Sequence, residues 1–218
     1  IKGTLGKLYA KADRIDLGKE IARLNKIDLS DTAVTLLMND TTTNKDTTST
    51  AVNWKLVLER IDLNRVAFAM QMPDDSLRLS TYIDKAGLTD GMVDLGSARY
   101  SAARFLLSGS SLGYDGNNSD PTPGFDPAHI ALSDVNIRID SLLYGGRDIG
   151  ARIKEFSAND RSGLTLSSLT GDISSDSTTI QVPGLLLKTP YSELRLLATV
   201  PWSSFDNTPS GTLRSLLT

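Results

Sequence analysis

The stretch Leu29-Ser30-Asp31-Thr32-Ala33-Val34-Thr35-Leu36 carries the pattern that decides the fold: a leucine, four residues, an apolar residue, one residue and a second apolar residue. The pattern recurs in Leu63–Met70, Leu88–Leu95 and Leu132–Ile139. Three of the four copies have aspartate at the third position. Because aspartate hydrogen-bonds its own backbone in turns, the pattern predicts a strand that ends at the leucine, a tight polar turn and a new strand.

A shorter repeat places aspartate between two apolar residues. Its copies are Ile15-Asp16-Leu17, Ile27-Asp28-Leu29, Ile61-Asp62-Leu63 and Val93-Asp94-Leu95. On a strand, such a tripeptide puts its carboxylate on the face opposite the two apolar side chains. The uneven spacing of the copies argues against a solenoid of regular coils and favours a degenerate stack of antiparallel strands.

Alternation of apolar and polar residues extends to other segments, such as Val52–Leu58 and Thr178–Val182. The sequence therefore predicts an all-β chain of roughly 15 short strands, which at about 4.8 Å each would extend on the order of 70 Å. Two segments, Lys11–Lys26 and Ser97–Leu107, also suit helices. Their flanks alternate, so strand is favoured, and a helix at 97–107 stays open.

Polar connectors interrupt this pattern at two places. The segments 40–50 and 113–127 are rich in Thr, Asn, Asp, Gly or Pro and are predicted to be flexible surface loops. Two glycine-containing stretches, 107–112 and 142–147, are predicted to be hairpin turns. Since alternation continues to both ends, we expect residues 1–218 to be one repeat-like β segment, a fragment of a larger protein.

Charge and composition exclude several classes of function. The net charge is −3, and the 23 basic residues are scattered among 26 acidic ones, so a nucleic-acid partner is not expected. The chain has no cysteine, which excludes disulfides and thiolate metal sites. No apolar run approaches the ~20 residues of a membrane-spanning helix. We therefore expect no cofactor and no metal.

Catalytic motifs are also missing from the sequence. His129 is the one histidine, and its place at the start of a strand favours a structural, hydrogen-bonded role over that of a general base. The carboxylate pair Asp74-Asp75 would need sugar-stacking aromatics to act on a glycoside, and the two tryptophans, Trp54 and Trp202, lie far apart in sequence. We predict that the chain is not an enzyme and has no catalytic residues.

Three stretches carry a resemblance to a known family. They begin at Phe125-Asp126-Pro127-Ala128-His129-Ile130, at Arg161-Ser162-Gly163-Leu164-Thr165-Leu166 and at Val182-Pro183-Gly184-Leu185-Leu186-Leu187. With the segment Leu88–Tyr114, they resemble the periplasmic middle portion of TamB-like translocation and assembly module proteins, within the AsmA-like group. About two thirds of the chain is covered.

The resemblance implies an elongated antiparallel β-sheet curved into a U-shaped, β-taco-like groove. It further implies a periplasmic segment of an inner-membrane-anchored protein that bridges to the outer membrane, carries phospholipid between them and supports outer-membrane protein assembly. The expected partners are phospholipid or another acyl lipid and, through the full-length parent, the outer-membrane protein assembly machinery.

Eight apolar side chains are predicted to line the lipid groove. They are Val34, Leu36, Phe68, Met70, Val93, Leu95, Ile137 and Ile139. The outer face would carry Asp28, Asp62, Asp94 and Asp140. Whether a second layer covers the apolar face stays open, as do lipid or polypeptide cargo, transport direction and oligomeric state. The alternatives are a chaperone-like module that binds outer-membrane β-strands by edge pairing, and a carbohydrate-binding β-sandwich.

Overall fold

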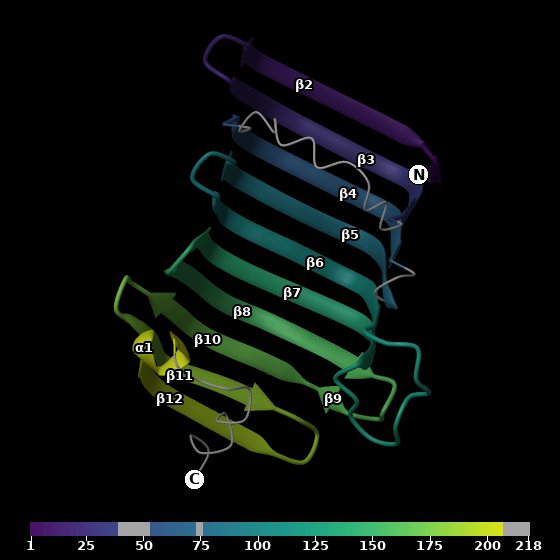
Figure 1. The fold of residues 1–218 in the computed structure, drawn as a ribbon, viewed down its shortest axis with the longest axis vertical. Coiled ribbons are helices and arrows are strands. Elements are labelled where there is room, and N and C mark those ends of the chain that lie inside the picture. The colour runs from purple at the N-terminus through teal and green to yellow at the C-terminus, as the bar shows by residue number, and fades with distance from the viewer. Residues whose placement is uncertain (39–52, 73–75, 207–218) are drawn as a thin grey trace.

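The computed structural model describes residues 1–38, 53–72 and 76–206, and these residues form one open sheet of 12 strands (Figure 1). The strands are β1 (Lys2–Thr4), β2 (Lys7–Asp16), β3 (Ile21–Leu37), β4 (Lys55–Met72), β5 (Leu77–Asp94), β6 (Arg99–Asp115), β7 (His129–Gly145), β8 (Asp148–Asp160), β9 (Thr165–Leu166), β10 (Ser168–Ser175), β11 (Thr179–Lys188) and β12 (Glu193–Pro201). A single helical turn, α1 (Ser203–Asp206), follows β12. The prediction of an elongated all-β sheet is confirmed.

The sheet follows chain order, β1-β3-β4-β5-β6-β7-β8-β10-β11-β12, with β2 also beside β3 and β9 beside β8. Neighbours are antiparallel, as expected, except β3 and β4, which run parallel. Their register offsets every pair by 34 residues, so Ile27-Asp28-Leu29 lies directly beside Ile61-Asp62-Leu63. Parallel pairing thus brings two copies of the sequence repeat side by side.

The predicted strand–turn–strand reading of the leucine pattern is wrong. Each copy runs along one continuous strand of 17 or 18 residues, with only Leu95 beyond the end of its strand, and the third residue of each copy is an irregularity with positive φ rather than a turn. These residues are Asp31 (φ 54°), Arg65 (φ 51°), Asp90 (φ 51°) and Asp134 (φ 50°). The stretch 107–112, predicted to be a hairpin turn, likewise lies inside β6, with Gly109 at φ 59°. Long strands replace pairs of short ones, so nine steps of about 4.8 Å give a sheet about 43 Å long rather than 70 Å.

Positive-φ residues explain why the leucine and the next apolar residue of the pattern are an odd number of positions apart. In a regular strand, residues five apart such as Leu29 and Val34 would face opposite sides. A bulge inserts one extra residue, so that both apolar side chains point to the same face of the sheet, and it bends the strand locally. The exposed Asp31 is followed by the buried Thr32, and the exposed Arg65 by the buried Val66, as this account requires.

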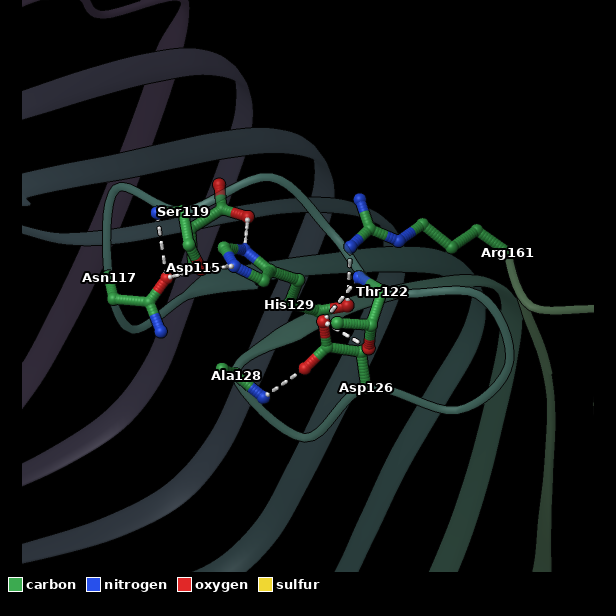
Figure 2. A network of polar contacts seen from close by, with 8 residues as sticks. All are labelled: Asp115, Asn117, Ser119, Thr122, Asp126, Ala128, His129 and Arg161. Atoms are coloured by element: carbon green, nitrogen blue, oxygen red, sulfur yellow. Dashed lines mark hydrogen bonds and ion pairs between the residues drawn. The ribbon is translucent and has the colours of Figure 1, made fainter.

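These irregularities line up across the sheet. Asp31, Arg65, Gly109 and Asp134 form one line over β3, β4, β6 and β7, and Asp90 and Ser141 mark a second line. Aligned bulges bend neighbouring strands in concert, and the ribbons in Figure 2 curve together.

Two buried hydroxyl groups stabilise the first bend. The Thr32 hydroxyl donates to the Ser30 carbonyl (3.1 Å) and accepts from the Gly6 N–H (3.3 Å). In the same way, the Ser110 hydroxyl donates to the Ser108 carbonyl (3.1 Å) and accepts from the Asp84 N–H (3.3 Å). Since Asp84 has no partner in the strand register, the hydroxyl satisfies a backbone donor that the irregularity releases.

The other sequence predictions have mixed outcomes. The segment Lys11–Lys26 spans the end of β2 and the start of β3, and 97–107 contains the first part of β6. No helix therefore forms in either segment. A turn between Gly145 and Asp148, with Gly146 at φ 64°, joins β7 to β8 as predicted. The loop predicted at 113–127 begins later, because Gly113–Asp115 belong to β6. The loop predicted at 40–50 lies outside the described residues, which end at 38 and resume at 53.

Replacing a bulge residue tests the role of positive φ. We expect Asp90→Val to lower the free energy of unfolding by about 1–2 kcal/mol, because a β-branched side chain is strained at φ 51°. Asp90→Gly should cause no loss, since glycine adopts this conformation without a Cβ clash. Urea denaturation followed by circular dichroism measures both. Glu59→Val, at an exposed neighbouring position without positive φ, is the control, and an equal loss there would contradict the account.

Candidate functional site

The apolar face consists of rows of side chains that lie directly opposite one another on successive strands. Two central rows run from β3 to β8: Ile27, Ile61, Leu88, Phe105, Ile139, Ile153 and Leu29, Leu63, Ala86, Leu107, Ile137, Phe156. Beyond the first bend, a further pair of rows contains Val34, Phe68, Thr81, Leu112, Leu132 and Leu36, Met70, Leu79, Tyr114, Ile130. Opposite residues share a face of the sheet, so each row forms a lane, which is wholly apolar in the two central rows and is interrupted by Thr81 in one of the further rows.

The predicted groove residues fall in different lanes. Val34 lies opposite Phe68 and Leu36 lies opposite Met70, so the structure brings these four together. Ile137 and Ile139 belong to the two central lanes, on the other side of the first bend.

The remaining two predicted residues lie near the other end of the strands. Val93 lies opposite Leu56 and Tyr100, beyond the second bend. Leu95 follows the end of β5 and is 41% exposed, so it belongs to no lane. The other seven side chains are half-buried.

No second layer covers this face in the part of the chain that the structure describes. All described strands belong to one sheet, which also rules out the architecture of a β-sandwich. Among the described residues, only six apolar side chains are fully buried: Ala22, Leu58, Val66, Ala102, Val135 and Ala158. So small a set of buried side chains is typical of a single layer that has no second layer packed against it.

The opposite face is polar, and several of its charges are paired. Lys26 contacts Asp28 at 2.7 Å, and Arg60 holds Asp62 through two hydrogen bonds of 2.6 and 3.0 Å. The hydrogen bond from the Arg60 side chain is the main reason why the pKa of Asp62 lies below its ordinary value. The sequence reasoning found these aspartates but missed the basic residue two positions earlier, which gives the fuller pattern basic–Ile–Asp–Leu in three copies.

The other two aspartates predicted on the outer face also have basic partners. Asp94 contacts Lys55 at 3.0 Å on β4, and Asp140 lies 3.5 Å from Arg104 on β6. At the first bend, Arg65 and Asp31 form a two-fold hydrogen bond of 2.7 and 3.0 Å. These exposed pairs each contribute little to stability, but together they keep this face hydrated.

A polar cluster surrounds His129 where β6, β7 and the loop between them meet (Figure 2). His129 is 3% exposed, with Nδ1 3.2 Å from the Asp115 carboxylate and Nε2 3.2 Å from the Ser119 hydroxyl. Arg161 of the β8–β9 connection donates to the His129 carbonyl at 2.8 Å.

The order Asp115–His129–Ser119 is that of an acid–base–hydroxyl chain, but the hydroxyl points elsewhere. Ser119 donates its one proton to the Asn117 side-chain oxygen at 2.5 Å, so its oxygen is left to accept from the ring. A nucleophile needs the histidine to accept that proton. The geometry therefore supports the predicted structural role of His129, which ties the loop to the end of β6.

Asp126 holds the other half of this loop. Its side chain is only 8% exposed and accepts from the Thr122 N–H (2.9 Å), the Thr122 hydroxyl (3.1 Å) and the Ala128 N–H (3.0 Å). The hydrogen bond from the Thr122 backbone is the largest cause that lowers the pKa of Asp126.

Three further findings limit the chemistry of the described residues. They contain no group of three or more His, Asp or Glu side chains placed to hold a metal ion. None of their helices is long and apolar enough to cross a bilayer. Asp74 and Asp75, considered as a glycosidase pair, lie outside the described residues.

Comparison with known proteins found no matching family model, no matching curated sequence and no matching solved structure. The geometry of the two faces is therefore the basis of any functional argument, and the resemblance to TamB-like proteins stays a prediction.

The hydrogen bonds that the Asp126 side chain accepts predict how the loop between β6 and β7 responds to acid. Because the folded-state pKa of Asp126 lies below the unfolded value near ~3.9, the stabilisation is present above that pH and is lost as the pH falls through the folded-state pKa. Hydrogen exchange of the amides of 116–128 should accelerate, relative to the rest of the sheet, between pH 5 and pH 2. Asp126→Asn should flatten this dependence, whereas Asp120→Asn, an exposed residue in the same loop, should leave it unchanged.

Proposed function

We propose that this chain is a periplasmic segment of a membrane-bridging protein, in which the apolar face of the sheet shields lipid acyl chains during transport between the inner and outer membranes. The observation that carries the proposal is the set of uninterrupted apolar lanes on a face without a second layer. Large apolar surfaces left uncovered by a fold are typical of binding sites.

The dimensions of the lanes suit an acyl chain. The central lanes cross six strands, so five steps of about 4.8 Å make them about 24 Å long. One leaflet of a bilayer is about 15 Å deep in hydrocarbon, half of the ~30 Å core. A chain laid along a lane would gain about 0.8 kcal/mol per buried methylene, and the charge-paired outer face would stay in water.

The location and the role in outer-membrane protein assembly rest on the sequence resemblance. The single bent sheet is the architecture that the resemblance implies, and this agreement supports extending its function to the present chain. Transport requires no chemical step, which accords with the polar cluster at His129 acting as a structural clamp.

A charge placed in the lane tests the proposal. Ile137→Asp should abolish binding of a fluorescent fatty acid such as parinaric acid, because the carboxylate would lie between Leu107 and Phe156 in the central lane. Leu106→Asp is the matched control, since Leu106 points to the polar face and is 40% exposed. Circular dichroism melts of both variants separate lost binding from lost folding. Equal fatty-acid binding by both folded variants would contradict the proposal.

A second candidate function, edge pairing with an extended polypeptide strand, is favoured by the difference between the two edges of the sheet. Along β2, Lys7, Lys11, Asp13 and Arg14 place charges on the edge, a common protection against pairing. The last five residues of β12 before Pro201 carry no charge, and Leu197 is 66% exposed. An added strand would gain backbone hydrogen bonds along β12.

A single charge on β12 tests this second function. Leu197→Lys should weaken the capture of a peptide taken from an outer-membrane β-strand by several-fold, since a lysine on an edge strand opposes pairing. Leu8→Lys on β2, where Leu8 is 55% exposed, provides the control at the charged edge. Surface plasmon resonance with the immobilised peptide measures both variants. If neither variant differs from the unmodified chain, β12 is not the receiving edge.

A further inference from the structure

A hollow of about 740 Å³ is lined mainly by residues of the polar face, together with Leu63, Ala86, Leu107 and Ile137 of one central lane. Every strand from β2 to β8 contributes to its lining, beginning with Lys7 on β2 and ending with Glu155 on β8. The hollow therefore runs across the strands, parallel to the long direction of the sheet (Figure 1).

The shape of this trench suits a chain-like ligand. Six steps between seven neighbouring strands give a length of about 29 Å, so the hollow is long enough to lie along an extended polymer.

One row of the trench floor consists of polar side chains that have no partner. Lys7, Ser30, Asn64 and Lys85 lie directly opposite one another on β2, β3, β4 and β5. Within the described ranges, none of these four side chains makes a hydrogen bond or an ion pair to another side chain. Two lysines whose backbones lie about 14 Å apart, three strand steps, thus flank a serine and an asparagine.

The charges of the trench favour an anion. Its lining holds five basic and three acidic side chains, although the whole chain carries −3. Two of the acids, Asp28 and Asp62, are already held by Lys26 and Arg60. The basic groups of the floor row have no such neutralising partner, so the local excess is positive.

We propose that this trench binds a linear acidic polysaccharide, with Lys7 and Lys85 contacting carboxylates of the polymer and Ser30 and Asn64 hydrogen-bonding its hydroxyl groups. Hydroxyl and amide side chains both donate and accept, as do the hydroxyls of a sugar. No aromatic residue lines the trench, so a neutral glycan that relies on ring stacking is disfavoured. The two lysines that would contact the polymer, Lys7 and Lys85, lie outside the apolar lanes.

Fluorescence anisotropy with an end-labelled oligogalacturonate tests the site on the whole chain. The unmodified protein should bind the oligomer, with affinity that falls as salt is raised, and should not bind a labelled maltodextrin of the same length. The double variant K7Q/K85Q should raise the dissociation constant about tenfold. Asn64→Ala should also weaken binding, but without changing its salt dependence, because the lost contact carries no charge.

The matched control is the double variant K19Q/K154Q, which removes the same charge from exposed positions outside the trench. It should bind like the unmodified chain, and thermal melts should show all variants folded. An equal loss in both double variants would mean general electrostatic attraction and would overturn the proposal. Tighter binding of labelled polyglutamate than of oligogalacturonate would overturn it in favour of an acidic polypeptide, and no binding of either would refute the site.

Discussion

The positive φ of a few aligned residues is the constraint on which the rest of the structure depends. A left-handed residue with a side chain costs roughly 1–2 kcal/mol, and the structure contains Asp31, Arg65, Asp90 and Asp134 in that conformation, each inside a long strand. This cost is offset because the apolar residues before and after the irregularity are then buried on the same face of the sheet. Without the extra residue, half of each strand would turn its apolar side chains to water.

The bend also requires its own polar partners. Thr32 and Ser110, both buried, use their hydroxyls to satisfy backbone groups next to the irregularity, while Arg65 and Asp31 pair on the outside. The parallel register of β3 and β4 places Asp28 beside Asp62, an arrangement of like charges that is unfavourable on its own. Lys26 and Arg60, each two residues before its aspartate, neutralise that repulsion.

Bending a single layer separates the molecule into two surfaces with different chemistry. One side carries apolar lanes that run from strand to strand, and the other side carries ion pairs and a trench in which some polar groups have no side-chain partner among the described residues. Neither surface contains a constellation suited to bond-making among the described residues, because the one histidine, His129, is buried and its neighbouring hydroxyl donates elsewhere. The functional proposals made for these two surfaces are accordingly binding functions.

The sequence by itself determined the all-β class, the apolar alternation and the presence of a repeated leucine pattern, because side-chain alternation is a local property of a strand. It did not distinguish a bulge from a turn after Leu29 or Leu63, since both use the same residues, and the choice depends on whether neighbouring strands bend at the same place. Nor did it reveal the parallel register of β3 and β4, or that Val34 and Ile137 occupy different lanes. Strand order and register are set by long-range pairing, so only the tertiary structure decided which apolar residues share a lane and which polar residues line the trench.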